Sequence, residues 1–443
     1  MRKAALHNLG CKVNSYETEA MQQLLEAAGY QIVDFEEKAD VYIINTCSVT
    51  NVADKKSRQM LHRAKAKNPE ALVVAAGCYA QAAGEKLLED TTIDLVIGNN
   101  KKAELVQLLE ERLAGREAQD AVIDISAAQE YEALHIERQA DHTRAFIKVQ
   151  DGCNQFCSYC IIPYTRGRIR SREPEDVAAE VEGLARAGYR EIVLTGIHLS
   201  SYGLDFAEER RVGLLGLIER LHEIDGIGRI RLGSLEPRIV TREFAERLAS
   251  MEKVCPHFHL SLQSGCDATL KRMNRHYTTA EYLERCELLR EVFGHPAITT
   301  DVIVGFPGET EEEFAQTRAF LERVHFYEMH VFKYSRRAGT RAAVMPDQVP
   351  EPVKTRRSDE LLKLERELSA SYRDSFLGTC GEILLEEEIT LDGKTYMTGH
   401  TKEYVRAAVE GFSGRKNELV SGRFTGYAAD GILLMETLPE SKL

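Results

Sequence analysis

The alternation of short apolar runs with helical segments over residues 1–333 is the feature that most limits what this chain can fold into. In the first part, helices predicted at 16–28, 54–66, 80–89 and 102–113 alternate with strands predicted at 4–9, 41–44, 72–76 and 95–97. A second series repeats strand and helix six times, with strands predicted at 145–149, 191–194, 230–232, 257–262, 298–304 and 328–333. The helices between them are predicted at 174–187, 214–222, 242–251, 280–293 and 311–324, and Thr310 with Glu313 fits a capping box that begins the last of these. Such alternation predicts parallel strands joined by helices. We therefore expect an α/β protein with an amino-terminal doubly wound parallel sheet and a central partial (β/α)6 barrel.

The pattern changes after residue 352. A charged linker helix is predicted at 353–376, and short strands separated by Gly, Asp and Asn turns follow at 378–385, 395–400, 404–409, 419–427 and 432–436. This is typical of a small all-β barrel. Residues 115–140, rich in Ala, Gln, Glu and Asp, predict a linker with one short strand at 121–125. The predicted division is 1–114, 115–140, 141–352, 353–376 and 377–443.

The bulk composition is that of a globular protein. The amino-terminal residues do not resemble a signal sequence, and the longest apolar run is too short to span a bilayer, so we expect a cytoplasmic protein with no membrane partner. Ten cysteines in such a chain indicate metal ligands or buried thiols instead of disulfides. A net charge of −13 argues against a protein that coats nucleic acid, although local basic clusters can still contact phosphate.

Cys153, Cys157 and Cys160 follow the first predicted barrel strand directly, in the spacing C-x3-C-x2-C. A structural zinc site needs four ligands, and an electron-transfer cluster normally takes four cysteines. Three thiolates on a four-iron cluster leave one iron open for a small molecule. Since parallel barrels place their active sites at the carboxyl ends of the strands, the triad predicts a catalytic iron–sulfur centre. Three unrelated buried thiols are the alternative.

Cys11, Cys47 and Cys78 form a second, dispersed triad. Each comes just after a predicted strand of the amino-terminal sheet, and glycine precedes two of the three. The carboxyl ends of parallel strands share one edge of a sheet, where ligands bind. We therefore expect these thiolates to meet at a second cluster that is also one ligand short. Unrelated buried thiols again remain the alternative.

Together the two triads resemble one family, the radical S-adenosylmethionine (SAM) methylthiotransferases. The resemblance covers almost the whole chain. GCKVNSYETE (10–19), NTCSVTNVADKKSR (45–58) and AAGCYAQ (75–81) resemble its amino-terminal cluster domain, and DGCNQFCSYCIIPYTRGRIRSR (151–172) resembles its radical SAM signature. The last ~70 residues resemble its RNA-binding β-barrel, a TRAM-like module.

The resemblance implies two 4Fe–4S clusters. Cys153, Cys157 and Cys160 would hold the cluster that binds and cleaves SAM to a deoxyadenosyl radical, and Cys11, Cys47 and Cys78 would hold an auxiliary cluster that carries the sulfur. An aromatic C–H is too weakly acidic for side-chain bases, so its hydrogen has to leave as an atom, and the cofactor supplies that chemistry. A second SAM would methylate the sulfur. A flavodoxin- or ferredoxin-type protein would supply electrons, and the sulfur donor is unknown.

Further positions are assigned by the resemblance and by their place at strand ends. The predicted SAM-binding residues are Tyr159, Thr195, Gly196, Ser234, Glu236, Gln263 and Val302. The predicted substrate-binding residues are Arg166, Arg168 and Arg170, which suit tRNA phosphate or a carboxylate. Ordinary hydrogen bonding at strand ends is the alternative for the SAM-binding set.

Several other residues that could bind metal are predicted not to do so. Cys255, His257 and His259 lack a fourth ligand and are expected to be ordinary barrel residues. Cys266, Cys286 and Cys380 have no partners in the sequence and are expected to be inert.

The known substrates of the family are threonylcarbamoyladenosine and isopentenyladenosine in tRNA and an aspartate of a ribosomal protein. The motifs at 10–19 and 45–58 most resemble the threonylcarbamoyladenosine branch, with Lys12-Val13 where the isopentenyl branch usually has another pair. The implied reaction is methylthiolation of carbon 2 of threonylcarbamoyl-modified adenosine 37. The alternatives are the other two substrates, or a non-catalytic iron–sulfur protein that binds RNA.

Overall fold

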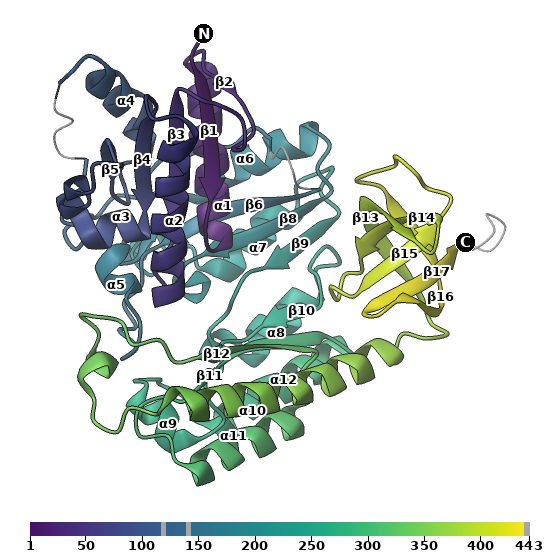
Figure 1. Ribbon diagram of the computed structural model, residues 1–443. Coiled ribbons are helices and arrows are strands. Elements are labelled where there is room, and N and C mark those ends of the chain that lie inside the picture. Colours follow the sequence, from purple (N-terminus) through teal and green to yellow (C-terminus); the bar gives the residue numbers. More distant parts are fainter. Residues whose placement is uncertain (117–120, 139–142, 438–443) are drawn as a thin grey trace.

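The computed structural model describes residues 1–116, 121–138 and 143–437. It contains a parallel α/β sheet, a curved central α/β unit and a small β-barrel (Figure 1). Parts of the predicted linker 115–140, the first residues of the predicted unit 141–352 and the end of 377–443 lie outside the described residues. No helix among the described residues is long and apolar enough to cross a membrane.

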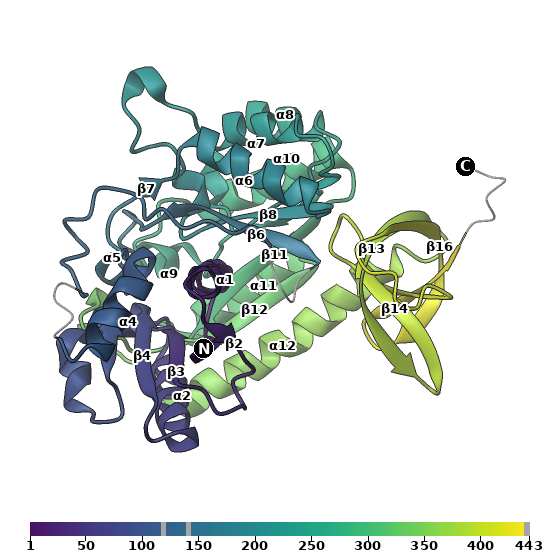
Figure 2. The ribbon, with the colours of Figure 1, turned by 90° about the horizontal axis from the view of Figure 1, so that it is seen from above.

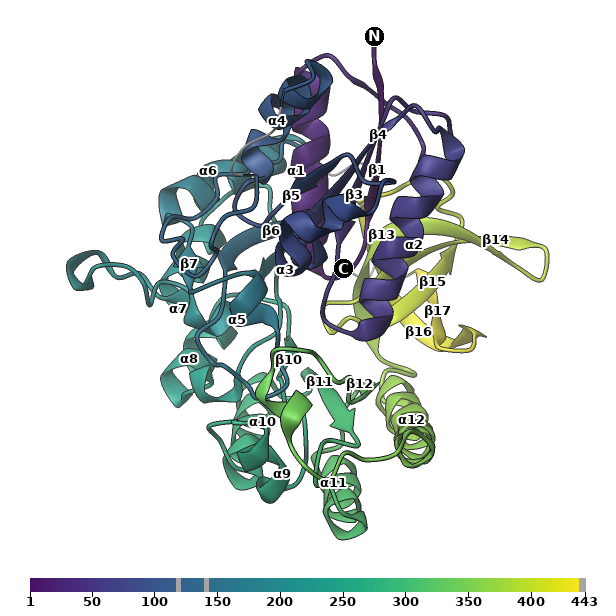
Figure 3. The same ribbon diagram turned by 60° about the vertical axis from the view of Figure 1, so that its left-hand side comes forward.

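The amino-terminal sheet is parallel throughout, in the order β2-β1-β3-β4-β5. Its strands are β1 (Lys3–Asn8), β2 (Gln31–Ile32), β3 (Val41–Thr46), β4 (Leu72–Gly77) and β5 (Leu95–Ile97). Its helices are α1 (Lys12–Ala27), α2 (Asn51–Lys67), α3 (Cys78–Ala83) and α4 (Leu105–Leu113). Side chains alternate along each strand, so one core packs against α1 and α4 and a second against α2. Figure 3 shows α1 and α2 on opposite sides of the sheet, which confirms the predicted doubly wound arrangement.

The central unit is an open parallel barrel. Its parallel strands are β6 (Arg144–Asp151), β8 (Glu191–Gly196), β9 (Arg229–Leu232), β10 (His257–His259), β11 (Ala297–Val304) and β12 (Glu328–Lys333). The two sheets β7-β6-β8-β9 and β10-β11-β12 are joined by isolated bridges such as Leu235–Leu260, and β7 (Arg170–Ser171) is antiparallel to β6. The surrounding helices are α6 (Pro174–Arg186), α7 (Leu214–His222), α8 (Arg242–Ala249), α9 (Asp267–Arg272), α10 (Thr279–Phe293) and α11 (Glu311–Val324).

The two faces of this barrel differ sharply in polarity. On β6, Ile147 and Val149 belong to the core shared with the helices, whereas Lys148 between them pairs with Glu17 on α1. The same alternation occurs on β9 and β10, where Ile230 and Phe258 are core residues. The period of two therefore gives an apolar outer face and a polar concave face, which the amino-terminal domain partly covers.

The long helix α12 (Glu351–Asp374) leads from the central unit to the β-barrel (Figure 2). That barrel closes in the order β13-β14-β15-β17-β16. Its strands are β13 (Cys380–Leu391), β14 (Lys394–His400), β15 (Arg406–Glu410), β16 (Leu419–Ala429) and β17 (Ile432–Thr437). Arg229 and Arg231 at the start of β9 donate to the backbone carbonyls of His400 and Lys402, so the loop after β14 lies against the amino-terminal end of the central barrel.

Some details of the predicted elements were wrong. Residues 121–125 form no strand, because their backbone contacts are a bond from Gly98 N to Ala121 O and one from the Gln81 amide to Ile123 O, with no ladder. The strand predicted at 257–262 ends at His259, and beyond it only isolated bridges continue the pairing.

Candidate functional site

The loop that carries Cys153, Cys157 and Cys160 follows β6 at the carboxyl end of the barrel strands. Gly152 has φ +70°, and a Cβ there would lie 1.8 Å from the carbonyl oxygen of Arg168. The Cys153 N–H donates to the carbonyl of Gly167 at 3.0 Å. Because glycine has no side chain, the loop can fold tightly at residue 152 against residues 167–168.

The thiols of this loop influence one another and have a cationic neighbour. Burial raises the pKa of Cys153 to about 11, and the charge of Cys157 adds to the effect. Burial also raises the pKa of Cys160, to which Cys157 and Cys153 contribute. Arg275 Nη1 lies 3.2 Å from Cys157 Sγ. Sequence reasoning missed Arg275, since nothing local marks a residue more than a hundred positions from the cysteines.

The structure brings Cys11, Cys47 and Cys78 together at the carboxyl ends of β1, β3 and β4, which are neighbours in the sheet. Gly10 has φ +113°, and a Cβ there would lie 2.9 Å from the Cβ of Cys47. Burial raises the pKa of Cys47 to about 11, and the charges of Cys78 and Cys11 raise it further. The charges of two of the thiols thus affect the pKa of the third, so the three side chains are neighbours at the edge of the sheet where they were predicted to meet.

A buried network of charges lies beside this second triad. Glu17 on α1 contacts Lys102 Nζ at 3.2 Å, Lys148 Nζ at 2.8 Å and Arg166 Nη1 at 2.8 Å. Asp151 at the end of β6 contacts Lys148, Arg166 and Arg170. Four cations thus share two carboxylates, and all six side chains are at most 2% exposed.

The cations of that network outnumber its carboxylates, and one of them lies beside a cysteine sulfur. Arg166 Nε lies 3.2 Å from Cys78 Sγ, and the Asn99 amide lies 3.6 Å from the same sulfur. Buried cations without enough carboxylates need another anion, and thiolates that bind iron are anionic. N–H groups directed at sulfur are also typical around iron–sulfur clusters, where they tune the reduction potential. The residues present therefore fit an iron–sulfur cluster at each triad.

The two triads are close in the fold. Asn99, which approaches Cys78, also donates to the carbonyl of Thr165 at 2.7 Å. Thr165 ends α5 (Ile162–Thr165), which directly follows the loop of Cys153, Cys157 and Cys160. Helices α3 and α5 accordingly lie near one another (Figures 1 and 3).

The residues predicted to bind SAM lie around the same end of the barrel. Thr195 and Gly196 end β8, Glu236 is buried and accepts from Arg238 Nε at 2.7 Å, and Ser234 is exposed. Gln263 is buried with φ +73° and pairs with the backbone around Val302. The Val302 side chain belongs to the outer core, so only its backbone could face a ligand. The Tyr159 ring packs edge to face against Phe306, and burial raises the pKa of the Tyr159 hydroxyl.

The arginines predicted to bind the substrate differ in accessibility. Arg166 and Arg170 are buried and engaged internally, Arg166 with Glu17 and Asp151, and Arg170 with the carbonyls of Arg166 and Arg168. Neither can reach an RNA in this structure. Arg168 is exposed and lies over the Phe156 ring, so it is the member of the set that a substrate could contact.

Sequence analysis set His259 aside as an ordinary barrel residue and did not find that it lies beside other polar side chains on the concave face. His259 Nε2 lies 3.4 Å from Asp301 Oδ2, and the His259 and His330 rings stack at 5.7 Å. These three side chains are close enough to hold a metal ion. The signal was the alternation of polar with apolar residues in segments such as His257–Phe258–His259, which is expected of a barrel with one polar face.

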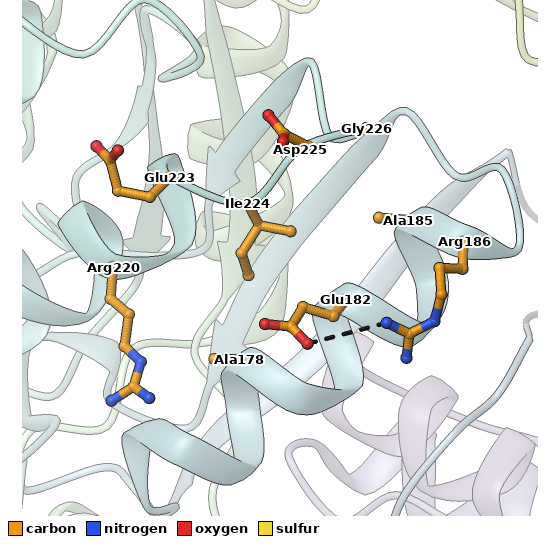
Figure 4. A pocket seen from close by; sticks show the side chains of 9 residues that line it. All are labelled: Ala178, Glu182, Ala185, Arg186, Arg220, Glu223, Ile224, Asp225 and Gly226. Carbon is orange, nitrogen blue, oxygen red and sulfur yellow. Dashed lines mark ion pairs between the residues drawn. The ribbon is translucent and has the colours of Figure 1, made fainter.

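A surface pocket of about 600 Å³ lies elsewhere, on the outer helices α6 and α7 (Figure 4). Its lining includes Glu182 and Arg186, which pair at 3.9 Å and are more than half exposed. Its lining holds charged side chains but no cysteine, and none of the residues of the two triads or of the concave face, so it does not extend the site described above.

Two family profiles match the chain: "Radical SAM superfamily" over residues 147–321 and "Uncharacterized protein family UPF0004" over residues 3–98. Among curated proteins, the chain is 42% identical over 412 residues to "Threonylcarbamoyladenosine tRNA methylthiotransferase MtaB" of Bacillus subtilis (strain 168), covering 93% of this chain and 91% of that protein. It is 40% identical over 389 residues to "tRNA-2-methylthio-N(6)-dimethylallyladenosine synthase" of Thermoanaerobacter sp. (strain X514), covering 86% and 81%.

Among solved structures, the fold resembles the radical S-adenosylmethionine methyltransferase TsrM of Kitasatospora setae with cobalamin and a [4Fe-4S] cluster bound. The TM-score is 0.57 at 16% identity, covering 77% of this chain and 74% of that one, which is a likeness of fold alone. These two curated relatives match 93% and 86% of the chain at 40% identity or more, and the two family profiles cover both cysteine triads. This protein therefore belongs to the radical SAM methylthiotransferase family, whose cofactors are SAM and 4Fe–4S clusters.

Proposed function

We propose that this enzyme attaches a methylthio group to carbon 2 of threonylcarbamoyl-modified adenosine 37 in tRNA. The observation that carries the proposal is the meeting of two cysteine triads, one from each α/β unit, beside a polar concave face. The relative from Bacillus subtilis, named for threonylcarbamoyladenosine, supports the choice of substrate, as does a similar protein of Aquifex aeolicus (strain VF5) at 40% identity.

The proposed roles follow the two triads. Cys153, Cys157 and Cys160 would hold the SAM-binding cluster, and the dispersed triad at 11, 47 and 78 would hold the auxiliary cluster. When bound, one SAM and its cluster supply the one-electron chemistry that removes the hydrogen atom, while the auxiliary cluster and a second SAM supply sulfur and methyl.

The chain itself positions these groups. Gly152 keeps the SAM-cluster loop tight, and Arg275 and Arg166 each place a cation beside a ligand sulfur. Exposed Arg168 is proposed to contact the RNA, and the carboxyl-terminal barrel to bind tRNA beside the site. A flavodoxin- or ferredoxin-type protein is the proposed electron donor.

Mass spectrometry of tRNA nucleosides tests the substrate. Deletion of the gene should remove methylthio-threonylcarbamoyladenosine, and the wild-type gene should restore it, whereas a Cys153→Ala variant should not. If the deletion removes methylthio-dimethylallyladenosine instead, the substrate is dimethylallyladenosine, the base in the name of the Thermoanaerobacter relative. If both nucleosides are unchanged while a ribosomal protein loses a methylthio group, the tRNA proposal fails.

Iron analysis tests the cofactor assignment separately. Protein prepared without oxygen should contain about eight iron atoms per chain, and the triple variant at Cys11, Cys47 and Cys78 about four. An unchanged iron content in that variant would contradict an auxiliary cluster on these residues.

A further inference from the structure

Lys12 lies where the auxiliary triad meets the concave face of the central barrel. It is the first residue of α1 and directly follows Cys11, and both residues are solvent-accessible. Its charge interacts with Arg144 and Glu191, the first residues of β6 and β8, and with Arg231 on β9. The side chain therefore extends from the proposed cluster toward the amino-terminal end of the barrel strands.

The charges around Lys12 do not balance. Each neighbouring arginine has its own carboxylate: Arg144 pairs with Glu386 at 3.5 Å, Arg229 with Glu382 at 3.0 Å and Arg231 with Glu191 at 2.7 Å. Within the described part of the chain, Lys12 makes no hydrogen bond or ion pair. Of these four cations, Lys12 is the one that has no carboxylate within ion-pair distance among the described residues.

An imidazole beside Lys12 also has a ring nitrogen without a hydrogen bond. His257 is 7% exposed, its Nδ1 makes no hydrogen bond, and its ring stacks on Tyr404 at 5.0 Å. Lys12 is among the charges that act on His257. His259, two residues along the same face, has polar neighbours of its own, with Nε2 3.4 Å from Asp301 Oδ2 and Nδ1 3.0 Å from Thr299 Oγ1. Buried polar atoms without partners are rare, so this wall is suited to a ligand with polar atoms.

We infer that Lys12 binds the carboxylate of the threonylcarbamoyl group and thereby determines which modified adenosine the enzyme accepts. The inference rests on the proposed function. C2 and N6 both lie on the Watson–Crick edge of adenine, on either side of N1, and their bonds diverge from the ring. When C2 faces the cysteine triads, the N6 substituent therefore extends to one side of them. A substituent that runs along the concave face meets the unpaired ammonium of Lys12 and the polar wall of His257 and His259.

The same geometry discriminates against an apolar substituent. A dimethylallyl group would remove water from Lys12 and His257 without offering an acceptor, and a desolvated cation without a partner is costly. A carboxylate offers the ammonium a charge-assisted hydrogen bond. The difference in binding between the two modified bases therefore depends on Lys12.

The test compares two anticodon stem-loop RNAs, one with threonylcarbamoyladenosine and one with its methyl ester, which lacks the negative charge. Fluorescence anisotropy measures their affinities for anaerobically reconstituted full-length enzyme. The wild type should bind the acid about 10- to 100-fold more tightly than the ester, the range expected for one hydrogen bond between charged groups. Lys12→Met should bind both RNAs equally, and Lys12→Arg should restore the preference.

Lys38→Met is the matched control, because Lys38 is exposed in the segment before β3, at the end of the sheet opposite the cysteines. It should keep the wild-type preference. Equal binding of acid and ester by the wild type, or a preserved preference in Lys12→Met, would overturn the inference. Failure of the proposed function would give a different result. In that case the wild-type enzyme would methylthiolate dimethylallyladenosine but not threonylcarbamoyladenosine.

Discussion

Replacing Glu17 by Gln tests whether the buried charge network joins the amino-terminal sheet to the barrel. Glu17 lies on α1, which begins just after Cys11, and it contacts Lys102 within its own domain and Lys148 and Arg166 of the central unit. Glutamine keeps the shape and one possible hydrogen bond, but it removes the charge. Lys148 and Arg166 would then share Asp151 with Arg170, and Lys102 would keep only its contact with the Asn99 amide oxygen.

The size of the effect follows from these distances. At an effective dielectric constant of ~20, contacts at 2.8–3.2 Å are each worth about 5–6 kcal/mol before desolvation is subtracted. Desolvation offsets much of this, and removing one partner of a buried pair typically costs about 3–5 kcal/mol. For m of ~2 kcal/mol per M, the urea midpoint should fall by roughly 1.5–2.5 M.

Urea unfolding of anaerobic protein, followed by circular dichroism and by cluster absorbance, measures the loss. The control is Glu36→Gln, because Glu36 is 57% exposed and pairs with exposed Arg63, and such pairs contribute at most about 1 kcal/mol. Glu17→Gln should also lose iron from the auxiliary site, since α1 positions Cys11.

The pH dependence gives a second check on Glu17. Burial alone would raise its pKa, but Arg166, Lys102 and Lys148 outweigh burial and hold the pKa well below 4.5. The folded pKa lies below the unfolded one, so this stabilisation is present above about pH 4.5 and is lost as the pH falls further. The difference between wild type and Glu17→Gln should shrink in that acidic range. A loss at neutral pH no larger than that of Glu36→Gln would refute the reasoning.

Three further predictions concern other parts of the molecule. Gly152→Ala should abolish SAM-cluster assembly, measured as iron content, because its Cβ would overlap the Arg168 carbonyl, whereas Gly29→Ala, with nothing within 4 Å, should retain iron. Tyr404→Ala should make the carboxyl-terminal barrel more susceptible to limited proteolysis, because it removes a ring that lies 4.8 Å from two arginines. Burial lowers the pKa of His198 to about 4, so stability should fall as the pH drops from 6.5 toward 4, by about 2–3 kcal/mol, and His198→Asn should remove that slope in urea titrations.

Local patterns predicted much of the fold. The helices at 214–222 and 311–324 have the predicted bounds, the second because Thr310 and Glu313 form the predicted capping box. The strand predicted at 404–409 begins at Arg406 instead, because Tyr404 has φ +71° and lies against the central barrel. An aromatic residue near a strand end fits a strand pattern equally well, and only the neighbouring domain shows that it belongs to a loop.

The cysteine triads could be predicted because their positions depend on strand ends, which leave a strong signal. The basic cluster at 166–172 could not be interpreted in the same way. Arg166 and Arg170 look like an RNA-binding surface in the sequence, but their partners Glu17 and Asp151 come from elsewhere in the chain, and Glu17 lies in another domain. Whether an arginine is exposed or buried depends on those partners, which no local pattern reveals.

The same reasoning explains why a net charge of −13 says little about this site. Acidic residues dominate the average, yet the structure has a local surplus of positive charge at two places, beside Cys78 and around Lys12. A buried cation without a carboxylate is costly unless an anion arrives, and beside Cys78 the thiolates of a bound cluster would be that anion. Lys12 is solvent-accessible, so there the carboxylate of the substrate would add a charge-assisted hydrogen bond instead of relieving a burial cost. Helix α1 links the two places, because Lys12 begins it and Glu17, which contacts Arg166, lies further along it.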